Sequence, residues 1–310
     1  MKTFAILADV TCDLDEALQK QYDIRVLPGH LGLPDKREVL SKPEWDWCSG
    51  EEFYRNLKRN PSGYTTAPPN VVEFAAAMEE YAVQGVPVLA ITISGGMSST
   101  FNCAKQAKIA VLEKYPDAQI CCVDSRRFGP GFGLMAIYAA LCREQGMSLD
   151  QTYSYLEENK NKFHQAGWHD DLAFVAKKGR ITNAKAFFGT LAGIKPIGEF
   201  DSNGFTTVIG KVKGTRTALN VLLSYVEATA AAPEENIFFV AHSNRSKQAM
   251  EYKAMLEERF HPKAVYFGEV HASCGVNVGP GLVAVYYMGT PISEDLSEER
   301  KLIESFAEGE

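Results

Sequence analysis

The stretch VPVLAITISGGMSSTFNCAKQAKIAVLEKYPDAQICCVD, residues 86–124, decides the fold class. It opens with an apolar, β-branched run typical of a buried strand, passes through a turn rich in glycine and serine into a helix, and ends in a second strand. Strands that alternate with helices over short connections predict a parallel sheet covered by helices on both faces. Ligands of such sheets bind beyond the carboxyl ends of the strands.

The same alternation extends over about the first 160 residues. FAILADV and DIRVLPG are predicted strands, and LDEALQKQY between them is a helix that Asp13 can cap. VVEFAAAMEEYAVQ is an amphipathic helix that Asn70 can cap, and GLMAIYAALCREQG is a further helix. Residues 31–49 carry prolines, charges and two tryptophans, which predicts a loop, and a short helix follows in EEFYRNLKRN.

The second half has a different pattern. IKPIGEF and TTVIGKVKG are predicted strands of a hairpin that turns at Ser202, Asn203 and Gly204, and further strands and helices follow. This gives the second half an antiparallel character. We therefore predict two α/β domains, residues 1–160 and 161–310.

Composition excludes several classes of protein. The chain has 310 residues, 45% of them hydrophobic and 23% charged, which is typical of a globular protein with a substantial core. A formal net charge of -7 argues against nucleic acid as a main partner. The first strand is too short for a signal peptide, and no apolar run approaches the ~20 residues of a membrane helix, so we expect a cytoplasmic protein. The seven cysteines form no CxxC pair, and we predict neither a metal site nor a cofactor.

Two clusters of hydroxyl groups stand where strands meet helices. In GGMSSTF, Ser98 and Ser99 lie beside the N–H groups of a helix N-terminus, which together can bind an anion. The serines equally fit simple N-capping. In YTTAPPN, Thr65 and Thr66 precede a turn fixed by prolines. The residues alone do not distinguish a carboxylate from a phosphate.

Eight short segments, in order and over essentially the whole chain, resemble motifs of the DegV family of bacterial fatty-acid-binding proteins. They are ILADVTCDL, YTTAPP, ITISGGMSSTFNCA, VDSRRFGPGFG, KKGRI, IKPI, KVKGTR and NVGPG. The resemblance implies the two-domain DegV-type α/β fold, with a parallel, doubly covered sheet in the N-terminal domain and a mixed or antiparallel sheet in the C-terminal domain.

The resemblance also implies a function. The chain is expected to hold a long-chain fatty acid, such as palmitate, stearate or oleate, between its two domains, and not to act as an enzyme. Thr66 and Ser98 are the implied ligands of the carboxylate, with Thr65 and the backbone N–H of Ser99 behind them. Neutral donors at a helix terminus can stabilise an anion without a buried counter-charge.

A role as carrier follows for family members that serve a fatty acid kinase. The kinase is then an expected partner, and transient contact with a membrane is expected as well. Arg180 in KKGRI and Arg216 in KGTR stand at positions implied for the partner contact. Each arginine also fits an exposed solubilising charge or an internal salt bridge.

The sequence departs from the family pattern at the head-group motifs. ADVT stands where TDST is usual, and Ala67 and Pro68 replace a serine and a glutamine. Asn277 stands where a histidine usually precedes GPG, and its amide offers a donor at a similar reach. His271, six residues upstream, is not expected to take over that role.

Two groups of residues, and the function as a whole, have alternative interpretations. Two sets of apolar residues fit either ordinary core or an acyl tunnel. One follows KKGRI (Phe187, Phe188, Leu191, Ile194), and the other follows the strand that ends in ICCVD (Phe128, Phe132, Leu134). Ser98 as the nucleophile of a hydrolase would need a base, and among the six histidines only His242 is predicted at a strand end. There is no GxSxG motif. For the function as a whole, the third alternative to a carrier and a hydrolase is a regulatory module whose bound lipid has only a structural role.

Overall fold

The computed structural model describes residues 3–183 and 193–309, which form two compact units. The first unit contains Met1–Asp46, Ser62–Lys160 and His271–Ser273. The second unit contains Trp47–Pro61, Asn161–Val270 and Cys274–Glu310. Each unit is built on a sheet of its own, so the two are described in turn.

The first unit holds the predicted parallel sheet. Its four strands lie in the order β2-β1-β6-β7, and every neighbouring pair is parallel. The strands are β1 (Ala5–Asp9), β2 (Ile24–Leu27), β6 (Val88–Thr92) and β7 (Ile120–Asp124). All residues of β1 and β6 are buried, as expected for central strands covered on both faces.

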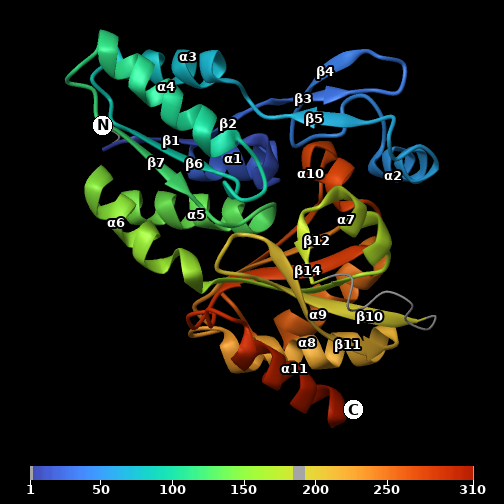
Figure 1. Ribbon diagram of the computed structural model, residues 1–310. Helices are drawn as coiled ribbons and strands as arrows, with labels where there is room; N and C mark the ends of the chain where they lie inside the picture. Colours follow the sequence, from blue (N-terminus) through green and yellow to red (C-terminus); the bar gives the residue numbers. More distant parts are fainter. Residues whose placement is uncertain (1–2, 184–192, 310) are drawn as a thin grey trace. The chain divides into compact units, whose positions relative to one another are not determined.

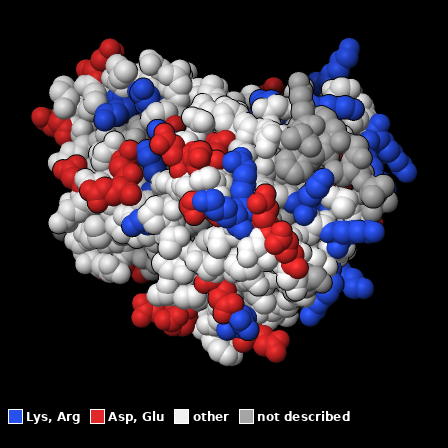
Figure 2. All heavy atoms as spheres, turned by 60° about the horizontal axis from the view of Figure 1, so that its bottom comes forward, with Lys and Arg blue, Asp and Glu red and all other residues white. Residues whose placement is uncertain are grey.

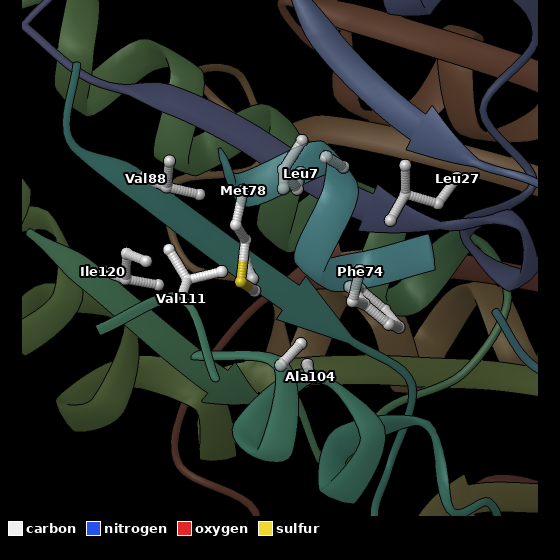
Figure 3. Packing of buried hydrophobic residues seen from close by; sticks show 11 residues of the cluster. Leu7, Leu27, Phe74, Met78, Val88, Ala104, Val111 and Ile120 are labelled. Carbon is white, nitrogen blue, oxygen red and sulfur yellow. The ribbon is translucent and has the colours of Figure 1, made fainter. Parts of the chain in front are cut away.

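Helices cover both faces of this sheet (Figure 1). One face carries α3 (Val71–Ala82) and α4 (Thr100–Lys114), and the other carries α1 (Glu16–Tyr22), α5 (Pro130–Glu144) and α6 (Leu149–Asn159). Side chains of α3 and α4 pack on the strands in a core that includes Phe74, Met78 and Val111 (Figure 3). The periodic apolar pattern of the two helices is thereby explained by burial.

A second, smaller sheet of the first unit has the order β4-β3-β5 and is antiparallel. It consists of β3 (Gly29–Gly32), β4 (Glu38–Ser41) and β5 (Thr65–Ala67). The prediction of a loop over residues 31–49 was therefore wrong for β4 and for the end of β3. Three of the four residues of β4 are exposed or half-buried, so this edge strand lacks the hydrophobic pattern that would reveal it.

The connection from β1 to α1 also differs from the prediction. A 3-10 turn, η1 (Val10–Cys12), follows β1, and Asp13 ends it with a φ of 54°. The N-cap of α1 is Asp15, whose carboxylate accepts the N–H of Leu18 at 2.8 Å. Asp13 instead accepts the N–H of His271 at 2.9 Å, a partner 258 residues away. Local sequence could not show that this carboxylate was already engaged.

The second unit holds a mixed sheet of seven strands in the order β13-β12-β14-β8-β10-β11-β9. The strands are β8 (Phe163–His169), β9 (Ile181–Thr182), β10 (Ile194–Phe200), β11 (Thr206–Lys213), β12 (Ile237–His242), β13 (Ala264–Glu269) and β14 (Leu282–Met288). β10 and β11 form the predicted hairpin, in which the N–H of Gly204 donates to the carbonyl of Asp201. The mixed sheet confirms the antiparallel character that we predicted for the second half.

The helices of the second unit are α2 (Gly50–Arg59), α7 (Leu172–Lys178), α8 (Thr215–Thr229), α9 (Ser246–Phe260) and α11 (Ser297–Glu308), together with the short η2 (Lys160–Lys162) at its start. α10 (Ala272–Val278) begins where the chain returns from the first unit. α8, α9 and α11 lie against the sheet (Figure 1). α2 packs on α10, because a Cβ at Gly275 would lie 2.9 Å from the ring of Phe53.

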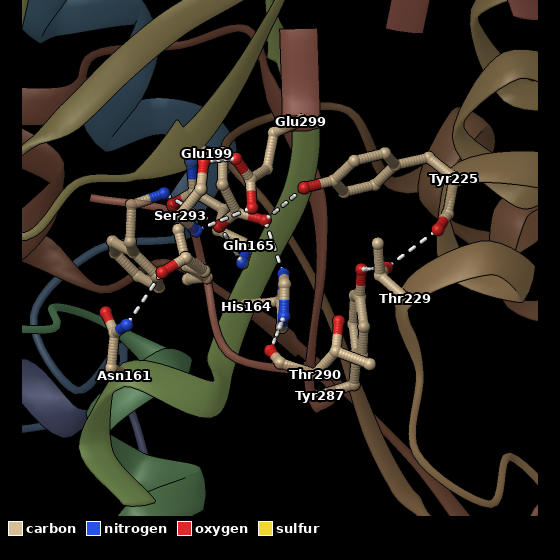
Figure 4. Close-up of polar contacts among 12 residues, drawn as sticks. Asn161, His164, Gln165, Glu199, Tyr225, Thr229, Tyr287, Thr290, Ser293 and Glu299 are labelled. Carbon is tan, nitrogen blue, oxygen red and sulfur yellow. Dashed lines mark hydrogen bonds and ion pairs between the residues drawn. The ribbon is translucent and has the colours of Figure 1, made fainter. Parts of the chain in front are cut away.

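A buried polar cluster joins the strands and helices of the second unit (Figure 4). His164 and Glu199 are both fully buried, and Nδ1 of the histidine lies 2.8 Å from Oε2 of the glutamate. Nε2 of His164 lies 2.7 Å from the carbonyl oxygen of Thr290. The Glu199 carboxylate also accepts the hydroxyl of Tyr225 at 2.9 Å and the N–H of Gln165 at 2.7 Å. The polar atoms of His164 and of the Glu199 carboxylate are therefore satisfied within the unit, whereas Oε1 of the Gln165 side chain has no hydrogen-bond partner among the described residues.

Charged side chains of both signs lie close together over much of one face of the molecule, and Lys and Arg project along one edge of it (Figure 2). Among the described residues, no helix is both long enough and apolar enough to cross a membrane.

Candidate functional site

The serine-rich loop follows β6 at the carboxyl edge of the parallel sheet, as predicted. Neighbouring loops hold it in place: the N–H of Ser94 donates to the carbonyl of Arg127 at 2.8 Å, and the N–H of Gly95 donates to Oδ1 of Asp124 at 3.0 Å. Oδ1 of Asp124 also accepts the N–H of Arg126 at 3.0 Å. Asp124 is thus a turn residue whose carboxylate organises the loop.

Ser98 and Ser99 stand at the start of α4. The Ser98 hydroxyl lies 2.7 Å from the hydroxyl of Thr100, and its N–H donates to the carbonyl of Ser94 at 3.1 Å. Ser99 occupies the N-cap position, yet within the described part of the chain its side chain makes no capping hydrogen bond. The first N–H groups of a helix have no partner within the helix, so the end of α4 keeps donors that an external acceptor can use.

Thr65 and Thr66 lie on β5, paired with Gly32 and Leu31 of β3. A Cβ at position 32 would lie 2.3 Å from Oγ1 of Thr65, so only glycine allows the threonine to take this place. The Thr65 side chain lies on the exposed side, and Thr66 is half-buried. Both hydroxyl groups can therefore be reached from outside the core.

The threonine strand and the serine loop lie at the same end of the parallel sheet. β3 begins two residues after β2 ends, so β5, its partner, also lies at the carboxyl edge. A Cβ at Gly29 would lie 3.0 Å from the carbonyl of Ala67 and 3.0 Å from Val10, which places the end of β5 against the loop after β1. The sheet therefore gathers both predicted hydroxyl clusters at one edge.

The Asp9 carboxylate joins the loops that follow β1 and β6. Its carboxylate is fully buried and accepts the N–H of Ile93 at 2.9 Å, the N–H of Thr11 at 3.0 Å and the Thr11 hydroxyl. Burial raises the pKa of the Asp9 carboxyl, although these hydrogen bonds act in the opposite direction. Asp9 thus fixes the ends of β1 and β6, which are the bases of two head-group motifs.

Asn277 lies on α10 in the second unit and is half-buried. The turn that follows it is tightly packed, because Gly279 has a φ of 71° and a Cβ there would lie 2.4 Å from the ring of Phe174. Glycine is therefore required at this turn by the packing within the second unit. His271 belongs to the first unit, where its Nδ1 lies 3.4 Å from Oδ1 of Asp13 and its ring 5.3 Å from that of Trp45.

The two predicted partner-contact arginines differ. Arg180 is exposed and follows the C-cap of α7, where its guanidinium donates to the carbonyl of Lys178. Arg216, also exposed, forms an ion pair with Glu251 at 3.0 Å, so it is an exposed charge in a surface salt bridge and not in an internal one. Arg180 keeps more of its donor capacity for a partner.

The structure describes only some of the residues proposed for an acyl tunnel. Phe187, Phe188 and Leu191 lie outside the described residues, and Ile194 begins β10. Phe132 and Leu134 are fully buried on α5, and Phe128 is 9% exposed, as expected for ordinary core of the first unit.

The surroundings of Ser98 do not resemble those of a catalytic nucleophile. Among the described residues, the hydrogen bonds of its hydroxyl go to Thr100 and to no histidine or carboxylate. His242 does end β12, but its Nδ1 accepts the N–H of Arg245 at 3.3 Å, and burial lowers its pKa to about 4. His169 ends β8 in the same way, which the sequence did not reveal, and burial lowers its pKa to about 4 as well.

No group of three or more His, Cys, Asp or Glu residues in residues 3–183 and 193–309 is arranged to hold a metal ion. Burial raises the pKa of the Cys122 thiol to about 12, so this side chain behaves as a hydrophobic group and not as a reactive thiolate.

A model of the family described as "Uncharacterised protein, DegV family" matches residues 3–290. The chain belongs to the DegV family. A DegV domain-containing protein of Clostridium perfringens is 33% identical over 291 residues, which cover 93% of this chain and 98% of the relative. The resemblance of the ordered motifs is thus confirmed over nearly the whole chain.

Solved DegV structures have the same fold. DegV of Bacillus subtilis, described as a fatty acid binding protein, matches with a TM-score of 0.79 and 25% identity over 94% of this chain and 100% of that one. A DegV family protein of Thermus thermophilus, whose structure is described as one of fatty acid binding, matches with a TM-score of 0.82 and 24% identity over 93% and 100%. The predicted α/β fold, with a parallel sheet in the first part of the chain and a mixed sheet in the second, is therefore confirmed.

Proposed function

We propose that this DegV protein binds one long-chain fatty acid and holds its carboxylate with the hydroxyls of Thr66 and Ser98, supported by Thr65 and the N–H of Ser99. The observation that carries the proposal is the start of α4. It combines the Ser98 hydroxyl, which accepts the N–H of Thr100 at 3.4 Å, with a helix N-terminus that the side chain of the N-cap residue Ser99 leaves uncapped, at the edge of a parallel sheet where ligands bind. Solved family members that are described as fatty acid binding supply the class of ligand.

The chemistry of this edge suits a carboxylate. Neutral hydroxyl and N–H donors stabilise an anion and lower its pKa when they point at it. An acyl chain of about 16 carbons would then add burial of on the order of 15 methylenes, each worth about 0.8 kcal/mol before ordering costs. Tight retention does not require a buried cation at the head group.

Native mass spectrometry of the purified protein, followed by extraction and identification of the lipid, tests the proposal. We expect a stoichiometric adduct with the mass of a fatty acid, released on denaturation. A protein that is free of lipid and takes up neither palmitate nor oleate would overturn the proposal.

Variants test the assigned residues. Thr66→Ala and Ser98→Ala each remove one hydroxyl, so we expect an increase of about tenfold or more in the dissociation constant for palmitate, measured by displacement of a fluorescent fatty acid. Ser62→Ala is the matched control, since this exposed serine lies in the same unit outside the two motifs. Equal affinity in all three variants would remove the assigned head-group site while leaving fatty-acid binding intact.

Finer parts of the function stay predictions. They are the location of the acyl chain between two domains (residues 1–160 and 161–310), the contribution of Asn277, and service as carrier to a fatty acid kinase through Arg180 and Arg216. A bound lipid with a purely structural role would give the same adduct but would not exchange with added fatty acid.

A further inference from the structure

The second unit contains a charged pocket of about 460 Å³, and Pro280 is the one residue of its described lining that belongs to a motif discussed above. Its lining includes three cations of α2 and three residues of the loops that follow β8 and β12. They are Arg55, Lys58 and Arg59, and Asp170, Asp171 and Arg245. All of these residues lie within the second unit, so the pocket is complete there.

The pocket lies at a position that the sheet topology favours for ligands. β8 and β12 are both antiparallel to β14, so they run in the same direction and their carboxyl ends share one edge. Asp170 directly follows β8, and Arg245 follows β12 after two residues and precedes α9. α2 covers this edge from the side and lies near α7 and α10 (Figure 1). The arrangement repeats, in a mixed sheet, the rule that ligands bind beyond the carboxyl ends of strands.

The cations of α2 are grouped and unpaired. Arg55, Lys58 and Arg59 are spaced by three and four residues, which puts them on one face of the helix. All three are exposed, and within the described part of the chain none of them forms an ion pair. Lys58 and Arg59 alone would fit favourable charges in the last turn of a helix. Arg55 lies a turn earlier and faces the same pocket, which this explanation does not cover.

The carboxylates of the pocket are largely committed to other groups. Asp170 pairs with Arg245 at 2.6 Å and with Lys195 at 2.6 Å. Burial alone would raise the pKa of Asp170, but hydrogen bonds from these two cations hold it below its usual value. Asp171 caps α7 by accepting the N–H of Phe174 at 3.0 Å.

Glu51 also lines the pocket, one turn before Arg55 and seven residues before Lys58, about 10 Å along the helix axis from the lysine. Three cations of α2 thus stand against one carboxylate of the same helix, and two of the cations lie in its last turn. Arg245 occupies the N-cap of α9, and its side chain makes no capping hydrogen bond. The positive end of the α9 dipole therefore also lies at the pocket, where it favours an anion.

We propose that this pocket binds a phosphate-bearing small molecule, held by the guanidinium groups of Arg55 and Arg59 and the ammonium group of Lys58. Two guanidinium groups can each bind phosphate oxygens in a bidentate manner, and an ammonium group adds a third positive charge. The volume exceeds the need of a single phosphate ion, which favours a diphosphate or a phosphate ester. The proposal does not depend on fatty acid binding.

Isothermal titration of the full chain with pyrophosphate and with ATP at low ionic strength tests the proposal. We expect saturable binding that weakens with salt, as for ionic contacts. The double variant Arg55→Gln/Arg59→Gln should weaken binding by about tenfold or more, since each charge-assisted contact contributes at least that factor. Both side chains are exposed, so the fold should persist, and circular dichroism checks this.

Two further variants make the outcome specific. Lys263→Gln, an exposed lysine just before β13 and so at the opposite edge of the sheet, should leave binding unchanged. Glu51→Gln removes a carboxylate from the pocket and should strengthen binding about twofold or more. No binding of either probe, or an equal loss in Lys263→Gln and the double variant, would overturn the proposal. Binding to phosphatidylglycerol vesicles without binding of soluble phosphates would overturn it too, in favour of a lipid surface.

Discussion

The loop of residues 95–99 and the cluster around His164 are both polar, but they treat their hydrogen-bonding groups in opposite ways. In the cluster, Glu199 accepts hydrogen bonds from a histidine, a tyrosine and backbone N–H groups, all of them buried. In the loop, Ser98 bonds mainly to its neighbour Thr100, and the N-terminus of α4 has no side-chain cap. One region is saturated by the protein itself, and the other keeps donors for an acceptor from outside.

The difference distinguishes polar groups that stabilise the fold from polar groups that can bind a ligand. A buried polar group without a partner costs about 1–3 kcal/mol, so a saturated cluster holds elements together and tolerates little change. A half-exposed loop with spare donors contributes less to the fold, and its donors can serve a ligand. Substitutions in the cluster should therefore affect stability, and substitutions in the loop should affect affinity.

The largest expected effect comes from His164→Phe. The ring of His164 stacks on Tyr287 with a centroid distance of 5.1 Å, which phenylalanine can reproduce, but both ring nitrogens are lost. Glu199 is then buried without this hydrogen-bond partner, so we expect a loss of about 3 kcal/mol in the free energy of unfolding. Urea denaturation followed by circular dichroism measures it.

Arg259→Ala is the control for this variant. It breaks an ion pair with Glu227 in which both side chains are about half exposed, so water screens the interaction and its effect should be much smaller than that of His164→Phe. Equal effects of the two substitutions would show that burial does not distinguish the His164 cluster from a surface ion pair.

A smaller effect distinguishes the starts of α3 and α4. Asn70 caps α3 by accepting the N–H groups of Val72 at 2.9 Å and Glu73 at 3.1 Å, whereas Ser99 makes no such bond. We expect Asn70→Ala to lower the free energy of unfolding by about 1 kcal/mol and Ser99→Ala to change it by less than about 0.5 kcal/mol. Thermal melts of the lipid-free protein compare them. A large loss in Ser99→Ala would mean that α4 is capped by its own serine and is not open to a ligand.

The smallest effect concerns pH. His30 on β3 lies 3.0 Å from Oε1 of Glu73 and 3.0 Å from Oε1 of Glu38, and the hydrogen bond to Glu73 raises the pKa of the imidazole above its usual 6.5. The stabilising contribution should be fully present below about pH 6.5 and should disappear as the pH rises through the higher pKa of the folded state.

Glu38 is 70% exposed, so water screens the interaction and we expect less than about 1 kcal/mol. Unfolding midpoints of wild type and His30→Gln between pH 5.5 and 8.5 test this: the difference between them should shrink as the pH rises. A difference that does not vary with pH would refute the ionic origin of the contact.

Much of the fold follows from local signals in the sequence. The strands β1, β6 and β7 are continuous apolar runs, Asn70 and Glu73 have the spacing of a capping box, and the hairpin of β10 and β11 has an Asn-Gly turn. The hydroxyl motifs were found for the same reason, because each is a short run at a strand–helix junction. The order in which these motifs occur along the chain then indicated the family.

Features that depend on distant partners could not be predicted. His164 and Glu199 are 35 residues apart, and nothing local marks either of them as a member of an ion pair. Asp13 resembles a helix cap until His271, 258 residues later, is known to donate to it. The pocket beside α2 was missed for a similar reason, since its cations stand in an ordinary amphipathic helix and its other wall comes from loops more than a hundred residues away.

The division of the chain between the two units has a consequence for biosynthesis. The chain passes from one unit to the other after residues 46, 61, 160, 270 and 273. When a ribosome has released the first 160 residues, the first unit still lacks His271–Ser273, and the apolar Phe53 and Leu57 of α2 still lack the later segments of the second unit. The first unit therefore cannot complete its contacts until residue 273 has been synthesised, and apolar side chains such as these stay exposed on the nascent chain in the meantime.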